Sequence, residues 1–209
     1  MNSTGPRSVN ISETENGKNF ISTSPFDMPC FTIDEQNNGA SLQFSSTVTS
    51  SNLGNNDRFS IDQNAGAFIP AGAFGTNASL CSFSLSQGLS SIGVMTQISN
   101  QLTELNGTST GVVPLTPFGV ISSFSASVVT TGQSIIEASG GVCRVRTTAT
   151  YDWSWEGEVD GNPMSLSGLE NCDSLSNPLV KGNCLCFGVS TGVTGSNLDV
   201  YTITFNALI

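Results

Sequence analysis

Residues 141–159, GVCRVRTTATYDWSWEGEV, hold both tryptophans of the chain and alternate between apolar and polar side chains. In a β-strand successive side chains point to opposite faces, so this alternation predicts one long strand. A strand of this length exceeds the usual range, and we expect a bend or bulge to divide it. The predicted inner face carries Cys143, Val145, Thr147, Ala149, Tyr151, Trp153, Trp155 and Val159.

The inner face of this strand ends in an aromatic row of Tyr151, Trp153 and Trp155. In a chain with two tryptophans, this row favours a protein core or a subunit interface. The alternative is a flat platform on which a glycan ring stacks. The row is therefore a candidate interface or glycan site.

The outer face of the same strand begins with Arg144 and Arg146 and ends with acidic residues. Such a polarised row suits pairing with an antiparallel copy or with the next subunit of a ring. The alternative is that each charge meets a neighbouring strand of its own chain, or water. Both arginines are therefore candidate interface residues.

Short alternating segments separated by Gly, Asn and Pro follow one another from Cys30 onward. Such spacing is typical of an all-β sandwich or barrel. We predict a single domain over residues 29–209, an antiparallel two-sheet sandwich of jelly-roll type or a related barrel. Residues 1–28 are polar and weakly patterned, which indicates a flexible N-terminal arm. Pro114 and Pro117 exclude a central strand over residues 112–120 and indicate an edge strand or a loop.

One segment, residues 93–107, departs from the alternating pattern. Met95, Ile98 and Leu102 recur at helical spacing, and Asn106-Gly107 is a typical helix stop. We predict one short amphipathic helix here that covers an open end of the sandwich. A strand through residues 92–98 is the alternative.

Charged residues make up only 11% of the chain, and the formal net charge is −10. The six basic residues are scattered, apart from one pair, so the chain lacks the clustered cations that nucleic-acid binding requires. Ser, Thr, Asn and Gly supply most of the polarity. Such a weakly charged surface favours a protein that packs against copies of itself or works outside cells.

No run of residues is long and apolar enough to span a bilayer, so we expect no membrane insertion. The N-terminal residues contain no apolar core of a signal peptide. A surface-type composition without a secretion signal predicts a virion protein, assembled in the host and released with the particle. The alternative is that a leader has been removed.

The chain contains no histidine, which excludes Ser-His-Asp and Cys-His catalysis and histidine-based metal centres. Glu156 and Glu158 would share a strand face, as the two carboxylates of a glycosidase do. Two solvated charges at the end of a strand are the favoured interpretation. We therefore expect no enzymatic activity and no cofactor.

The sequence contains two weak candidates for a metal site. A calcium site would use the alternating oxygen ligands of residues 156–162. A zinc site would use Cys172, Cys184 and Cys186, the closely spaced cysteines. The six cysteines leave open whether they are free or disulfide-bonded, although a chain folded in a cytoplasm would keep them as small buried hydrophobic residues. The calcium candidates are Glu156, Glu158, Asp160 and Asn162.

Together these features predict a non-enzymatic structural subunit of a virus or phage particle, such as a coat, decoration or tail-fibre component. Its partners would be copies of itself and other virion proteins. The scarcity of basic residues disfavours a coat that neutralises a packaged genome. The alternative is an extracellular glycan- or receptor-binding adhesion module with Trp153 and Trp155 as contacts.

Overall fold

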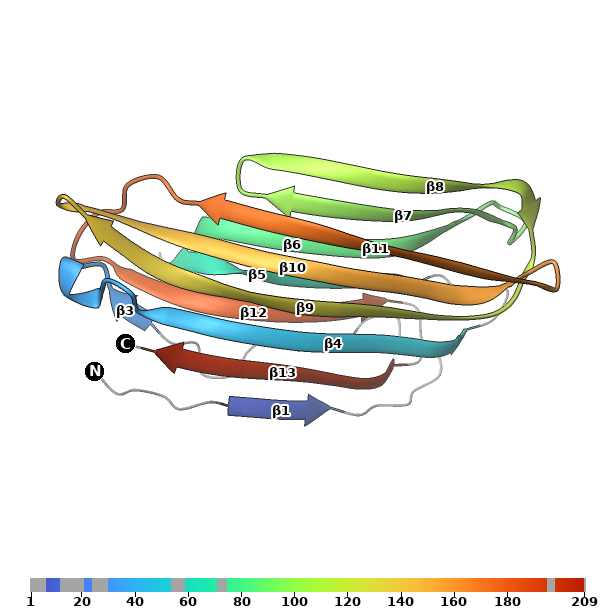
Figure 1. Ribbon diagram of the computed structural model, residues 1–209, viewed down its shortest axis with the longest axis horizontal. Coiled ribbons are helices and arrows are strands. Elements are labelled where there is room, and N and C mark those ends of the chain that lie inside the picture. Colours follow the sequence, from blue (N-terminus) through green and yellow to red (C-terminus); the bar gives the residue numbers. More distant parts are fainter. Residues whose placement is uncertain are drawn as a thin grey trace.

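Two antiparallel β-sheets packed face to face make up this protein (Figure 1), which confirms the predicted all-β sandwich. The computed structural model describes the backbone of residues 7–11, 21–23, 30–53, 59–70, 75–194 and 198–208. Side chains are described for residues 30–50, 59–70, 75–115 and 119–192.

The first sheet, sheet A, is built around the long strand predicted from the tryptophan segment. Its strands, in spatial order, are β1 (Arg7–Ile11), β13 (Leu198–Leu208), β4 (Ser41–Leu53), β9 (Ile121–Ser139), β10 (Val142–Val159) and β11 (Asn162–Leu175). Two-residue turns join β9 to β10 through Gly140-Gly141 and β10 to β11 through Asp160-Gly161, and all four residues have positive φ. Such turns match the twist of a hairpin.

The second sheet, sheet B, is a meander with short strands added at one side. Its strands, in spatial order, are β2 (Ile21–Thr23), β12 (Cys184–Thr194), β5 (Ser60–Ile69), β6 (Thr76–Leu89), β7 (Met95–Glu104) and β8 (Gly107–Gly119). Strand β3 (Cys30–Thr32) also pairs with β12. A short 3₁₀ helix, η1 (Glu35–Asn37), follows β3. Strand β8 lies at the edge of sheet B, as Pro114 and Pro117 predicted.

Two parts of the predicted N-terminal arm are strands. Strand β1 pairs with β13 in sheet A, and β2 pairs with β12 in sheet B. The expectation of a flexible arm is corrected for these two segments, because each forms backbone pairs with a long strand. The other residues of the arm lie outside the described residues.

The predicted helix over residues 93–107 is wrong, because Met95–Glu104 form strand β7. Met95, Ile98 and Leu102 all point into the core, although regular alternation would not place Met95 on the same face as Ile98. The pairing register shifts between Met95 and Gln97, which reverses the parity of the strand. A β-bulge thus imitates helical spacing in the sequence. The described residues contain no helix long and apolar enough to cross a membrane.

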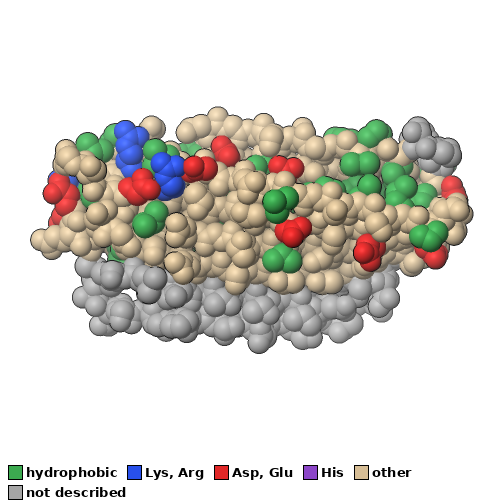
Figure 2. Space-filling view, viewed as in Figure 1, with side chains coloured by type: hydrophobic (Ala, Val, Ile, Leu, Met, Phe, Trp, Pro, Cys, Tyr) green, Lys and Arg blue, Asp and Glu red, His purple; other side chains and the backbone are tan. Residues whose placement is uncertain are grey.

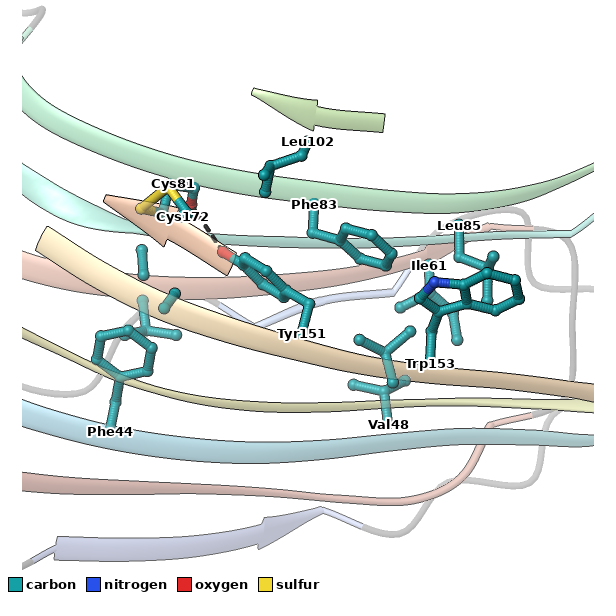
Figure 3. Packing of buried hydrophobic residues seen from close by; sticks show 14 of the residues in the cluster. Phe44, Val48, Ile61, Cys81, Phe83, Leu85, Leu102, Tyr151, Trp153 and Cys172 are labelled. Carbon is teal, nitrogen blue, oxygen red and sulfur yellow. Dashed lines mark hydrogen bonds between the residues drawn. A yellow bond between two sulfur atoms is a disulfide. The ribbon is translucent and has the colours of Figure 1, made fainter. Parts of the chain in front are cut away.

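The core lies between the two sheets and is centred on β10. Every residue of the predicted inner face of β10 is buried, from Cys143 to Val159. Figure 3 shows Tyr151 and Trp153 reaching from β10 toward Phe83, Ile61 and Leu85 of sheet B. Of the bend or bulge expected to divide this strand, the register shows no bulge in its middle: the one shift against β9 lies at its end, between Glu158 and Val159.

Candidate functional site

The aromatic row is part of the core and is not an exposed platform. Tyr151 and Trp155 are fully buried, and Trp153 is 4% exposed. The Tyr151 ring stacks on Phe83 with centroids 5.0 Å apart, and its hydroxyl donates a hydrogen bond of 3.0 Å to the carbonyl of Cys81. Burial raises the pKa of Tyr151 well above its ordinary value. The interpretation of these rings as a glycan or subunit contact is therefore corrected.

The two arginines of β10 find partners in their own chain. Arg146 lies between two carboxylates, with nitrogen–oxygen distances of 3.1 Å to Glu137 and 2.7 Å to Asp173. Figure 2 shows Lys or Arg side chains next to Asp or Glu side chains at one end of this face, with further acidic side chains along the rest of it. Arg144 donates a hydrogen bond of 3.2 Å to the carbonyl of Ser176. These contacts favour the intrachain interpretation of the polarised row.

The calcium candidates do not form a common site. Asp160 accepts a hydrogen bond of 2.9 Å from the amide of Val120, and Glu158 accepts one of 2.9 Å from the hydroxyl of Ser122. Within the described ranges, no group of three acidic side chains converges on one point. Glu156 and Glu158 instead flank a shallow trough on the outer face of sheet A, with Ser125 and Ser165 also in its lining. The geometry does not support the calcium prediction.

The cysteines, which the sequence left open as free or disulfide-bonded, form two disulfides. Cys81 is bonded to Cys172, and Cys30 is bonded to Cys186. Cys143 is a buried free thiol and Cys184 an exposed one. The predicted zinc set is also corrected, since Cys172 is engaged elsewhere and Cys30 takes its place beside Cys184 and Cys186.

The outer face of sheet A is broad, and acidic side chains are scattered along its length (Figure 2). A trough of about 660 Å³ crosses strands β4, β9, β10 and β11 on this face. We call it the Gly132 trough, because Gly132 lies opposite both Phe44 and Ala149 at its centre. Its lining contains no charged side chain. The polar lining consists of Gln43, Ser45, Thr131, Gln133, Thr148, Thr150 and Asn171.

A second feature lies along the side of the sandwich where β11 and β8 end their sheets. Strand β10 packs on β5 and β6, and β11 packs on β6 and β7. Figure 1 shows β8 continuing beyond β11, so that sheet B is wider than sheet A on this side. We call this arrangement the β11–β8 step: its wall is the outer edge of β11, which pairs with no described strand besides β10, and its floor is the face of β8.

The floor of the step is exposed along much of its length. Residues 107–110 of β8 are exposed, and Gly111 and Val113 are only half-buried. Met164 and Leu166 of β11 are partly buried hydrophobic residues beside this floor. Val112, on the other face of β8, is 52% exposed. A sandwich that buried both sheets equally would need one more strand beside β11.

The backbone groups that face the step can be assigned from one hydrogen bond. The amide of Asp173 donates to a carboxylate oxygen of Glu104 on β7 at 3.3 Å, so it points away from β10. In an antiparallel pair, every second residue of a strand directs its amide and its carbonyl to the same side of the strand. This alternation holds along β11, because β10 and β11 pair without a register shift. The same orientation therefore applies to Ser165, Ser167, Leu169 and Asn171.

Sequence reasoning predicted neither the step nor strand β11. The prolines of β8 indicated an edge strand or a loop, whereas β11 carries Pro163 only near its start. The offset between the sheets depends on which strands pack across the sandwich, and no local pattern encodes it. The trough likewise depends on cross-strand register, which places Gln43 opposite Gln133.

No protein-family model and no curated protein matches this chain. One similar solved structure is the CBM2 module of the evolved Dit of Lactobacillus casei BL23 phage J-1, at 10% identity and a TM-score of 0.34, covering 87% of this chain and 69% of that one. Another is the lectin UEA-II in complex with galactose, at 13% identity and a TM-score of 0.32, covering 97% and 99%. At such TM-scores these similarities carry no argument about ligands or partners.

Proposed function

We propose that this protein is a non-enzymatic structural subunit of a virus or phage particle and that it works by self-association. The β11–β8 step is the observation that carries this proposal. An edge strand exposes unpaired amides and carbonyls, and these groups add a further strand unless the edge is blocked. Sheet B blocks its edge with Pro114 and Pro117, whereas β11 has neither lysine nor proline after Pro163.

The shape of the step determines how a second copy can pair with β11. Two copies cannot join β11 to β11 directly, because β8 of each copy extends beyond its own β11 into the space that the other copy needs. A single extended segment fits, because it pairs with β11 and covers β8. Strand addition of this kind draws affinity from main-chain hydrogen bonds.

The N-terminal segment of a second copy is the strand that we propose for the step. In this segment β1 lies at the edge of sheet A, where β13 is its one neighbour among the described strands. Exchange of β1 between copies therefore breaks few contacts, as in domain swapping. Arg7 of β1 is opposite in charge to Glu104, whose carboxylate lies against the outer edge of β11.

The chemistry of the surface supports a particle in an extracellular setting. Only 11% of the residues are charged, so most of the surface is neutral and able to form hydrogen bonds with a neighbouring copy. The two disulfides suit an oxidising environment. We also propose that the protein is located in the virion and that other virion proteins are among its partners.

Ser167→Pro tests the step directly. This substitution removes an amide that faces the step and leaves the hydrogen bonds to β10 intact, so the fold survives. We expect wild-type protein at micromolar concentration to form oligomers by native mass spectrometry, and the Ser167→Pro protein to be monomeric.

Ser167→Ala is the matched control, because it changes the side chain and keeps the amide. It should assemble like the wild type. Deletion of residues 1–28 should also give monomers, because it removes the donated strand. A wild-type protein that stays monomeric, or a Ser167→Pro protein that assembles normally, would contradict the proposal.

A second candidate function is glycan binding at the Gly132 trough. Its lining of amides and hydroxyls, without charge, suits a neutral polyhydroxyl ligand, since each sugar hydroxyl both donates and accepts a hydrogen bond. This site replaces the buried tryptophans as the candidate glycan contact.

A glycan array on wild-type protein, followed by titration of any neutral sugar that binds, tests the trough. The Gln43→Ala/Gln133→Ala double variant should weaken binding at least about tenfold, the effect of losing about 1.4 kcal/mol of hydrogen bonding. Glu156→Gln, in the neighbouring trough, is the control and should bind normally. Equal binding by the double variant would exclude this site.

A further inference from the structure

Three cysteines meet where β3 pairs with the start of β12. Cys186 lies directly opposite Cys30 in the register and is bonded to it. Cys184 lies two residues before Cys186, on the same face of β12, and their sulfur atoms are 4.0 Å apart. All three sulfur atoms lie within 4.8 Å of one another. A free thiol therefore stands beside a disulfide.

The exposure of these residues gives each sulfur a different role. Cys184 and Cys30 are exposed, whereas Cys186 is 4% exposed. The attacking group in disulfide exchange is a thiolate, and Cys184 is the free thiol of the three and is exposed. Cys186 is shielded from soluble thiols but lies next to Cys184.

We propose that Cys30, Cys184 and Cys186 form an intramolecular thiol–disulfide exchange site. The Cys184 thiolate attacks the sulfur of Cys186, a Cys184–Cys186 bond forms, the Cys30–Cys186 bond breaks, and Cys30 leaves as a thiolate. One disulfide replaces another, so the step needs no external oxidant or reductant. The proton lost by Cys184 to solvent is balanced by the proton that Cys30 takes up.

The product requires a local change in the backbone of β12. Residues two apart in a strand have Cα atoms roughly 6.6 Å apart. This separation lies at the upper end of the range of about 4.4–6.8 Å in which disulfides form, so the start of β12 must bend to bring the two Cβ atoms together. The exchange moves the covalent link from between β3 and β12 to within β12. It therefore releases β3, and the N-terminal residues before it, from their covalent tie to sheet B.

The other cysteines of the molecule provide an internal contrast. The Cys81–Cys172 disulfide joins β6 to β11, and Cys143 lies on β10. Neither belongs to the converging group, which among the described residues contains Cys30, Cys184 and Cys186 alone. Exchange is therefore expected at one disulfide and not at the other.

Tryptic cleavage at the few basic residues separates the two isomers. Cys30 lies on the peptide of residues 19–58, and Cys184 and Cys186 lie together on the peptide of residues 182–209. The original isomer gives these peptides cross-linked, and the exchanged isomer gives them separate, with an internal disulfide in residues 182–209. Wild-type protein is incubated at pH 5 or pH 8.5, blocked with N-ethylmaleimide, digested without reduction and analysed by mass spectrometry.

In a time course, we expect the exchanged isomer to form at least about tenfold faster at pH 8.5 than at pH 5, because the attacking group is the thiolate. Cys184→Ser should give only the cross-linked peptide, and Cys143→Ser should behave like the wild type. The proposal is overturned if wild-type protein at pH 8.5 gives only the cross-linked peptide. Cys30→Ser provides a second test: its Cys184 and Cys186 should form a disulfide on mild oxidation, and thiols that stay free would also overturn the proposal.

Discussion

At the scale of single residues, alternation predicted burial along β10 but not the partners of its polar side chains. Each inner residue from Cys143 to Val159 is buried, since parity in a strand fixes the face of each side chain. The partners of Arg146 come from β9 and β11, and only the pairing register brings Glu137 and Asp173 beside it. A sequence contains no local signal for such cross-strand neighbours.

Gly132 shows how one residue shapes both the core and the trough above it. A Cβ atom at this position would lie 2.2 Å from the carbonyl oxygen of Thr148 and 2.5 Å from the ring of Phe44. A glycine inside a strand often marks such a close approach. Its absence of a side chain lets the Phe44 ring pack beside β9.

Gly132→Ala should therefore destabilise the fold by about 1–3 kcal/mol, because the strands or the Phe44 ring must move to admit a methyl group. Urea unfolding followed by tryptophan fluorescence measures the loss. Gly107→Ala is the matched control, since a Cβ atom there would meet nothing within 4 Å. Equal stabilities of the two variants would show that the contact at Gly132 relaxes without cost.

At the scale of elements, the sequence predicted strands well where alternation was unbroken and failed where a bulge changed parity. Residues 93–107 looked helical because the register shift near Met95 brings Met95, Ile98 and Leu102 to one face. Tertiary pairing with β6 and β8 decided the outcome against the local pattern. The same pairing leaves β8 at the edge, where its prolines cost no central hydrogen bonds.

The step and the exchange site were not predicted from the sequence, because both depend on how edge strands pair and pack. The step arises because β11 packs on β6 and β7 and leaves β8 uncovered, which is a property of the offset between sheets. The exchange site arises because β3 pairs with β12 across a sequence separation of 156 residues between Cys30 and Cys186. The sequence showed the cysteine cluster of residues 184–186 but gave no indication that Cys30 joins it.

At the scale of the whole molecule, the Cys81–Cys172 disulfide holds the two sheets together on the side of the step. It links β6 of sheet B to β11 of sheet A, across a sequence separation of 91 residues (Figure 3). A bridge over a long separation stabilises the fold mainly by restricting the unfolded chain. It also fixes β11 over β6, so the wall of the step keeps its place when a strand is added.

The Cys81→Ala/Cys172→Ala double variant should lose about 2–5 kcal/mol of the free energy of unfolding. Cys143→Ala removes one buried sulfur without removing a bridge, and it should cost only about 1 kcal/mol. Urea unfolding of both variants against the wild type, without reductant, separates the covalent effect from packing. Because β11 carries the wall of the step, the double variant should also oligomerise less below its unfolding transition. A double variant as stable as Cys143→Ala would show that side-chain packing alone holds the two sheets in place at this edge.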